Sequence, residues 1–225
     1  NGGIIGKINT PTTSLASGVW SLDSQFDSQS SSIWPLAFPN TTIANACRFN
    51  DGSSDYLTRS PSGSTDQEGT FSVWVKRGDI GVSDKSSMIT GYVDSSNYTR
   101  IHFRDSENTL QVYGYTSGSA VYNKITSRVF RDVAAWYHIV VQFDLSNSTA
   151  EDRIKIHVNG VRETSFSTNT NPSDTSKIHN FVNSAGNVNI GRFATSEYFD
   201  GYMAEVSFID NLSVDPTSFG AFNPV

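Results

Sequence analysis

Hydrophobic and polar residues alternate with a period of two over several short stretches of this chain, which is the pattern of strands with one buried face. The alternation is clearest in Phe71–Lys76, Arg100–Arg104 and Arg153–Val158. Trp136–Phe143 is instead an almost continuous apolar run, which predicts a central strand. Apart from a turn near Asp215–Phe219, no stretch of useful length has the spacing of an amphipathic helix.

Turn residues separate these stretches. Thr116–Ser119 divides Leu110–Tyr115 from Ala120–Ile125, and this arrangement predicts a hairpin. Asn159-Gly160 follows Val158 and supplies the residue types that accept the positive φ angles of a type I′ turn. Further strands are predicted at Asn187–Gly191 and Tyr202–Ile209. Many short strands at regular spacing predict an all-β sandwich or barrel.

The first 40 residues differ from the rest of the chain. They are rich in Gly, Ser and Thr, and their aromatic residues (Trp20, Phe26, Trp34 and Phe38) are isolated from one another. Because this segment has little periodicity, we predict an extended N-terminal arm over residues 1–40 and one domain over residues 41–225.

Composition and charge narrow the possible partners. The chain has 225 residues, a formal net charge of −6 and scattered basic residues, which argues against a nucleic-acid partner. It contains no apolar run near the roughly 18 residues that would span a bilayer, so membrane insertion is not expected. Its one cysteine, Cys47, lies in an apolar stretch and is predicted to be a buried thiol without a disulfide partner.

Four motifs in a fixed order resemble laminin-G-like and pentraxin-like domains. They are Phe71–Lys76, Trp136–Val141, Val158–Gly160 and the stretch Asn189–Val206. The resemblance implies a concanavalin A-like jelly-roll β-sandwich of two antiparallel sheets. Within that fold, Trp74 and Trp136 are predicted to fill the space between the sheets, and Gly191 and Gly201 to flank a loop with tight turns.

A second resemblance concerns the setting of the protein. Gly2–Lys7, Ala16–Leu22 and Trp34-Pro35 resemble the opening of virion proteins from tailed bacteriophages, especially marine ones, and Phe199–Asp210 with Asp215–Gly220 resembles their end. The resemblance implies a location on the surface of a virion and an arm that anchors the protein to other virion proteins or within its own homo-oligomer, for which a trimer is favoured.

The sequence offers little for catalysis. Glycosidases on related jelly rolls carry paired Glu residues on one strand, and no such pair is present here. The nearest groups of carboxylates, Glu151 with Asp152 and Asp105 with Glu107, lie in turn-like stretches and are predicted to be solvated. We therefore do not expect an enzyme.

Calcium is the one cofactor that the resemblance suggests, because these families often hold Ca²⁺ at the rim of the sandwich with hard oxygen ligands. The candidate ligands are Asp51 and Asp55, in a loop rich in oxygen donors, and Asp200. The chain departs from the family where Ala204 replaces an Asp, and Asp-rich loops are also ordinary turns.

Carbohydrate binding requires exposed aromatic rings that stack on sugars, together with polar groups for the hydroxyls. The candidates gather in the middle of the chain and are Tyr92, Tyr98, Tyr113, Tyr115 and Tyr122. Tyrosines at alternating positions can equally form the amphipathic margin of a core.

Three hypotheses for function follow. The first is a virion-surface adhesin that binds host surface glycans through the jelly roll. The second is a purely structural virion protein, such as a head-decoration or fibre subunit. The third is a secreted cellular laminin-G-like binding domain, against which the lack of a disulfide counts. Fold alone does not decide among them.

Overall fold

The computed structural model describes residues 45–63, 67–80, 85–173 and 179–220. These residues belong to one compact unit, Ile43–Phe222. Within the described ranges the chain forms thirteen strands and three short 3₁₀ helices, η1 (Asp51–Ser53), η2 (Ala150–Asp152) and η3 (Pro216–Phe219). The predicted arm over residues 1–40 lies outside the described residues.

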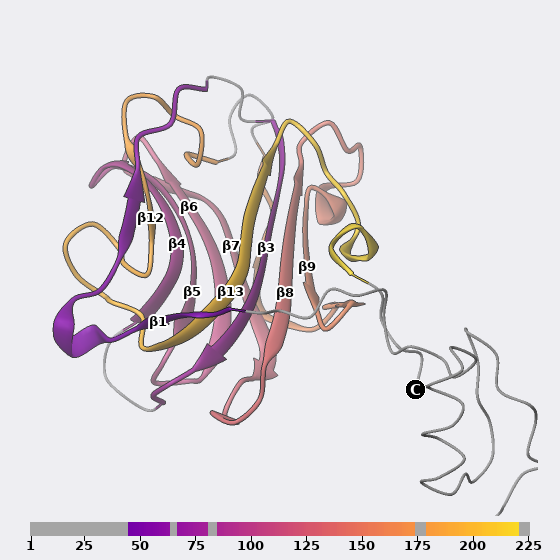
Figure 1. Cartoon of the computed structure of the whole chain (residues 1–225). Helices are drawn as coiled ribbons and strands as arrows, with labels where there is room; N and C mark the ends of the chain where they lie inside the picture. The colour runs from indigo at the N-terminus through magenta and orange to yellow at the C-terminus, as the bar shows by residue number, and fades with distance from the viewer. Residues whose placement is uncertain (1–44, 64–66, 81–84, 174–178, 221–225) are drawn as a thin grey trace, which may run out of the picture. The chain divides into compact units, whose positions relative to one another are not determined.

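The strands form two antiparallel sheets that lie face to face (Figure 1). The six-stranded sheet has the order β1 (Cys47–Phe49), β13 (Gly201–Asp210), β3 (Glu68–Arg77), β8 (Tyr137–Asp144), β9 (Ile154–Val158) and β10 (Val161–Arg162). The seven-stranded sheet has the order β11 (Phe166–Thr170), β7 (Ser119–Val129), β6 (Thr109–Thr116), β5 (Asn97–Arg104), β4 (Lys85–Asp94), β12 (Asn187–Ile190) and β2 (Leu57–Arg59). This architecture confirms the all-β jelly-roll prediction.

The hairpins form where the turn residues predicted them. Between β9 and β10, Asn159 and Gly160 have φ angles of 51° and 79°, as a type I′ turn requires. Between β6 and β7, Ser117 and Gly118 also have positive φ angles, 52° and 76°. Gly191 and Gly201 flank a loop, and both have positive φ (87° and 136°), which confirms the tight turns expected there.

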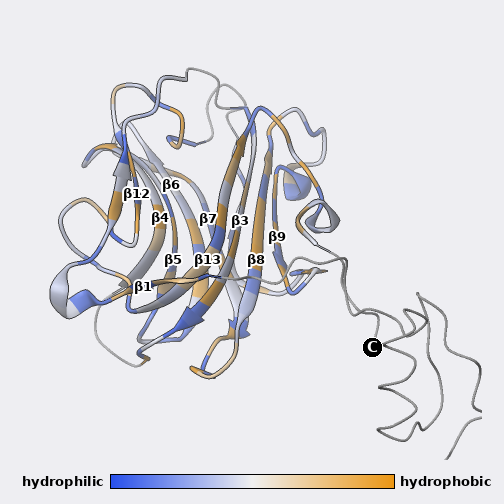
Figure 2. Ribbon diagram, viewed as in Figure 1, coloured by the Kyte–Doolittle hydropathy of each residue, from blue (hydrophilic) through white to orange (hydrophobic). Residues whose placement is uncertain are grey.

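The core lies between the sheets, and strand alternation decides which residues enter it. Phe71, Val73 and Val75 of β3 are fully buried and face Ile101 and Phe103 of β5 in one cluster. Hydrophobic residues recur along β3, β8 and β9 in Figure 2. Because β8 pairs with both β3 and β9, its apolar run is a central strand, as predicted.

The two tryptophans do not fill the space between the sheets, so that prediction is wrong. Trp74 alternates with Val73 and Val75, so its side chain lies on the outer face of the six-stranded sheet, where it stacks on His138 with ring centroids 4.8 Å apart. Trp136 precedes β8 and is 37% exposed. The large aromatic side chains in the core are instead phenylalanines and Tyr122.

Cys47 is also not where the apolar context predicted it. The thiol is free and exposed, because β1 is a three-residue edge strand of which only Phe49 is buried. A buried structural thiol is therefore excluded.

The segment that follows β13 crosses the outer face of the six-stranded sheet. The hydroxyl of Thr70 donates to the carbonyl of Leu212 (2.8 Å), and the side-chain amide of Gln142 donates to the carbonyl of Val214 (2.8 Å). Phe219 of η3 then packs edge-on against His138, with ring centroids 6.3 Å apart. This segment therefore covers part of that face, and the outer face of the other sheet carries the candidate site. Among the helices of the described ranges, none has the length and hydropathy needed to cross a membrane.

Candidate functional site

Four tyrosines lie on the face of the seven-stranded sheet that points away from the core. Tyr92 of β4 pairs in register with Tyr98 of β5, which pairs with Tyr115 of β6. Tyr113 lies two residues before Tyr115 and therefore shares its face. Each of the four side chains is half-buried, so part of each ring remains exposed. We call Tyr92, Tyr98, Tyr113 and Tyr115 the tyrosine platform.

The rings of the platform pack against one another. The Tyr98 ring is central: its centroid lies 5.2 Å from that of Tyr115, 6.0 Å from that of Tyr113 and 6.5 Å from that of Tyr92. Tyr113 and Tyr115 stack at 6.0 Å with an interplanar angle of 21°. These distances are within the range of favourable aromatic pairs, so the rings hold one another in place.

Phe193 adds a fifth ring from the loop between β12 and β13. It packs edge-on against Tyr92 and Tyr98, with ring centroids 5.5 and 4.9 Å apart. The loop is fixed to the sheet because the Gly191 amide donates to the carbonyl of Met88 (3.0 Å) and the Ser87 amide donates to the carbonyl of Glu197 (3.3 Å). Phe193 therefore forms a wall at one side of the platform.

A buried arginine lies beneath this wall. Arg100, 4% exposed, has its guanidinium carbon 4.5 Å from the centroid of the Phe193 ring and a nitrogen 2.6 Å from a carboxylate oxygen of Glu197. Its Nε donates to Nδ1 of His102 at 3.0 Å. Burial lowers the pKa of Arg100, and the Glu197 carboxylate opposes that shift. The guanidinium remains charged, and its charge is neutralised at short range.

Uncharged polar groups surround the platform. On the same face, the side-chain amide of Gln111 donates to the side-chain oxygen of Asn123 (2.7 Å). At the other side, Asn187, the register partner of Tyr92, accepts from the hydroxyl of Ser60 (2.9 Å). Burial raises the pKa of Tyr98 and of Tyr113, so both phenols stay protonated at neutral pH and can donate hydrogen bonds.

The fifth predicted tyrosine, Tyr122, is not part of this face. Its side chain is fully buried in the core, and its hydroxyl lies 3.0 Å from the hydroxyl of Thr99. Gly114 makes room for the ring, since a Cβ there would lie 2.2 Å from it. Tyr122 therefore cannot contact a ligand, and its inclusion in the predicted site is wrong.

The residues predicted to bind calcium are only partly brought together. Asp51 lies close enough to Asp200 to raise the pKa of that carboxyl, after burial as the larger cause. Asp55 instead accepts a hydrogen bond from the backbone amide of Asn50 (3.1 Å). Within the described ranges, no three His, Cys, Asp or Glu side chains form a group that could hold a metal ion.

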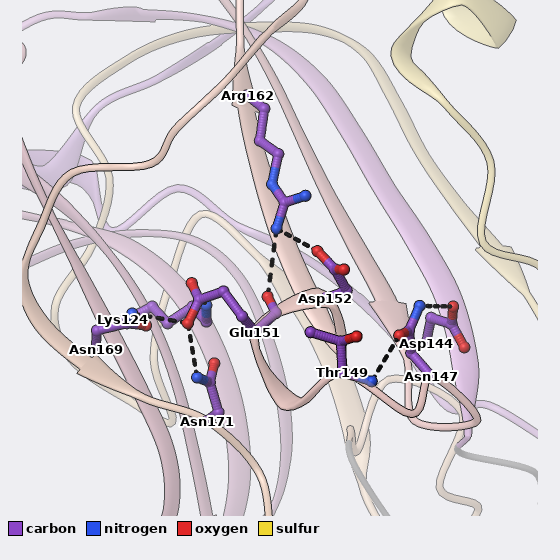
Figure 3. A network of polar contacts seen from close by, with 9 residues as sticks. All are labelled: Lys124, Asp144, Asn147, Thr149, Glu151, Asp152, Arg162, Asn169 and Asn171. Carbon is purple, nitrogen blue, oxygen red and sulfur yellow. Dashed lines mark hydrogen bonds and ion pairs between the residues drawn. The ribbon is translucent and has the colours of Figure 1, made fainter.

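Of the carboxylates predicted to be solvated, Glu107 and Glu151 are 46% and 42% exposed, as predicted, although each also forms an ion pair. Asp105 is 1% exposed and pairs with Arg77, so its prediction is wrong because the residue lies between the sheets. Glu151 accepts from Lys124 (2.9 Å), Asn169 (2.9 Å) and Asn171 (2.8 Å), as Figure 3 shows. Burial raises the pKa of Glu151, but these bonds together outweigh it and lower the pKa to about 2. The network joins β7 to the segments around η2 and β11 and has a structural role.

Sequence reasoning missed Arg100, Phe193 and Glu197. The position of Arg100 could have been found, because it alternates with Ile101 and Phe103 and must share the face of Tyr98. Phe193 and Glu197 lie in a loop where no periodicity indicates orientation.

The chain matches one family of known proteins over most of its length. Residues 51–213 match the laminin G family model described as the concanavalin A-like lectin/glucanases superfamily. Among curated proteins, none matches the chain.

Two solved structures have similar folds. One is domain 4 of AbnA, an extracellular arabinanase from Geobacillus stearothermophilus, in complex with arabinotriose: TM-score 0.56, 13% identity, 94% of this chain and 86% of that chain covered. The other is the CBM40 module of the Ruminococcus gnavus IT-sialidase bound to α2,3-sialyllactose: TM-score 0.50, 12% identity, 77% of this chain and 95% of that chain covered. At such identities the likeness shows the fold alone.

Proposed function

Because this chain belongs to the concanavalin A-like lectin/glucanases superfamily, we propose that it is a non-enzymatic module that binds carbohydrate on the tyrosine platform. The observation that carries the proposal is the arrangement of Tyr92, Tyr98, Tyr113 and Tyr115, which come from three adjacent strands and present partly exposed rings on one face.

The chemistry of the platform suits sugars. A sugar ring presents apolar C–H groups on its faces and hydroxyls on its edge, so aromatic rings stack on the faces while polar groups bind the edge. Tyrosine provides both, since each ring carries a hydroxyl. The amides of Gln111 and Asn123 lie on the same face of the sheet and add donors and acceptors.

Binding without hydrolysis is proposed because of how Glu197, in the loop that carries Phe193, is held. Glycoside hydrolysis uses a pair of carboxylates across the scissile bond, one of them as a general acid. Glu197 instead forms an ion pair with Arg100, with a nitrogen–oxygen distance of 2.6 Å. A carboxylate held by a guanidinium in this way is not placed to act with a second carboxylate across a glycosidic bond.

For the setting, we propose the surface of a phage particle. The support is the sequence resemblance of Gly2–Lys7, Ala16–Leu22 and Phe199–Asp210 to virion proteins of tailed phages. In this setting, the platform would bind host surface glycans, and the arm would assemble the protein into an oligomer with other virion proteins. A structural decoration protein would instead bury the platform against neighbouring subunits. Cryo-electron microscopy of the particle distinguishes the two, because the platform faces solvent in one case and protein in the other.

The direct test of sugar binding is a glycan array of bacterial and host polysaccharides, followed by calorimetry on the strongest hits. Tyr98→Ala removes the central ring, and we expect it to weaken binding by about tenfold or more, equivalent to about 1.4 kcal/mol. Tyr202→Ala is the matched control, since Tyr202 is 37% exposed on the other sheet. Equal loss in both variants, or no binding of any glycan by the folded protein, would contradict the proposal.

A further inference from the structure

We infer that the tyrosine platform selects uncharged sugars and discriminates against acidic ones, because the arginine beneath it is already neutralised by Glu197. The inference rests on the proposed function and names the class of carbohydrate that the same site would take. It follows from how the charged side chains on the outer face of β5 are partnered.

Two arginines project from the outer face of β5, and both pair with carboxylates. Arg100 contacts Glu197 at 2.6 Å, and Arg104 contacts Glu107 at 3.0 Å. Arginine is the residue best suited to bind a sugar carboxylate, because two N–H groups of its planar guanidinium can donate to the two carboxylate oxygens at once. On this face each guanidinium already forms an ion pair with a carboxylate of the protein itself.

Arg100 is the arginine that an acidic sugar would need. It lies opposite Tyr113 in the register of β5 and β6, and next to Tyr98 along the strand. Its side chain is buried under the ring of Phe193, where it forms an ion pair with Glu197 and donates a hydrogen bond from Nε to His102. An incoming carboxylate would have to displace Glu197, and until it did so it would meet a like charge in a partly desolvated site.

The phenols and amides of this face are neutral. The phenols of Tyr98 and Tyr113 stay protonated, since burial raises their pKa. Gln111 and Asn123 contribute amides. Hydroxyl and amide groups recognise the hydroxyls of a neutral sugar, and they compensate poorly for the desolvation of a carboxylate.

Glu197→Gln tests the inference directly. Glutamine has nearly the same shape and can still accept a hydrogen bond from Arg100, but it removes the neutralising charge. The guanidinium beneath the platform then has an uncompensated charge. We expect this variant to gain about tenfold in affinity for acidic oligosaccharides relative to neutral ones of the same length.

Glu107→Gln is the matched control. It makes the same change in net charge, but its partner Arg104 is the last residue of β5, whereas Tyr98 is the second. It should leave both classes of affinity unchanged. Thermal unfolding of each variant confirms that the fold is retained.

The experiment is an array that carries neutral and acidic glycans side by side, including lactose with α2,3-sialyllactose and arabinotriose with uronic-acid oligomers. Strongest binding to neutral glycans, with an affinity that does not change between about 50 and 500 mM salt, would support the inference. Acidic glycans as the strongest hits of the unmodified protein, or no gain for acids in Glu197→Gln, would overturn it while leaving sugar binding in place. No hits at all would overturn the proposed function as well.

Discussion

The guanidinium of Arg77 lies 2.6 Å from the carboxylate of Asp105, and both side chains are only 1% exposed. Arg77 is the last residue of β3 in one sheet, and Asp105 directly follows β5 in the other, so this ion pair joins the two layers. Asn108 accepts a second hydrogen bond from Arg77 (3.0 Å), and Ser86 donates to Asp105 (2.6 Å). Burial lowers the pKa of Arg77 and raises that of Asp105, so each charge depends on the other for compensation.

We therefore expect Arg77→Met to lower the free energy of unfolding by about 3 kcal/mol, because it leaves Asp105 buried without its partner. The double variant Arg77→Met with Asp105→Leu should recover much of the loss, since two apolar side chains need no compensation. Urea denaturation measures both. The control is Arg104→Met at the exposed pair with Glu107, where the expected loss is under about 1 kcal/mol. Equal losses at the two pairs would show that burial is not the cause.

Substitutions at Tyr122 and Tyr98 should have different effects, the first on stability and the second on sugar binding. Tyr122→Phe removes the hydroxyl that contacts Thr99 at 3.0 Å and is expected to cost about 1 kcal/mol of stability without changing sugar affinity. Tyr98→Phe keeps the ring of the platform but removes one exposed donor, and should weaken sugar binding with little change in stability. Thermal unfolding and calorimetry on the same samples give both quantities. Weaker sugar binding by Tyr122→Phe would contradict its placement in the core.

Strand alternation explains which parts of this fold were predictable. Phe71, Val73 and Val75 have the same parity and lie in the core, whereas Trp74 has the other parity and lies outside. The apolar residues on either side of Trp74 therefore predict that its side chain lies on the outer face. The expectation that a large aromatic residue fills the core was a weaker guide. Cys47 was misjudged for a related reason, since its apolar neighbours belong to a short edge strand.

Strand alternation also explains part of the candidate site. It groups Tyr113 with Tyr115 on one strand, but which residue of a neighbouring strand lies opposite them depends on register, which the sequence does not specify. The contributions of Phe193 and Glu197 depend on how a loop folds back over the sheet, and no local pattern encodes that path. Asp105 was expected to be solvated because its turn is polar, but its position at the end of β5 places it between the sheets.

Acid should destabilise this protein through its buried histidines. Burial lowers the pKa of His179 and of His138 to about 4 each. The unfolded chain has a histidine pKa near 6.5, so between about pH 6.5 and 4 the unfolded state binds protons that the folded state does not. Stability is therefore complete above about pH 6.5 and falls as the pH is lowered toward 4, by on the order of 2–3 kcal/mol per histidine.

His179→Gln tests this dependence. His179 is 2% exposed and contacts Phe143, Phe181 and Phe208, with ring centroids 5.2–5.7 Å away, so an imidazolium there has little compensation. The variant loses one titrating group, and the slope of unfolding free energy against pH between 4 and 6.5 should become shallower, whatever its absolute stability. Urea denaturation at a series of pH values gives the slope. An unchanged slope would mean that His179 already binds its proton in the folded state.

Gly191 and Gly118 allow the loop that carries Phe193 to be tested against a matched turn. Both have positive φ angles, 87° and 76°, which cost an alanine about 1 kcal/mol. At Gly118 nothing lies within 4 Å of an added Cβ, but at Gly191 the Cβ would lie 2.6 Å from the Phe49 ring, in the core. Gly191→Ala must therefore displace either Phe49 or the start of the loop, and we expect it to lower the free energy of unfolding by at least about 2 kcal/mol, against about 1 kcal/mol for Gly118→Ala.

The same substitution should also affect the site. Because the Gly191 amide donates to Met88 and its carbonyl accepts from Phe199, the displacement should move Phe193 away from the platform and weaken sugar binding, which Gly118→Ala should leave intact. Calorimetry and urea denaturation of both variants decide it: equal stability losses, or full sugar affinity in Gly191→Ala, would mean that the loop does not form the wall of the site.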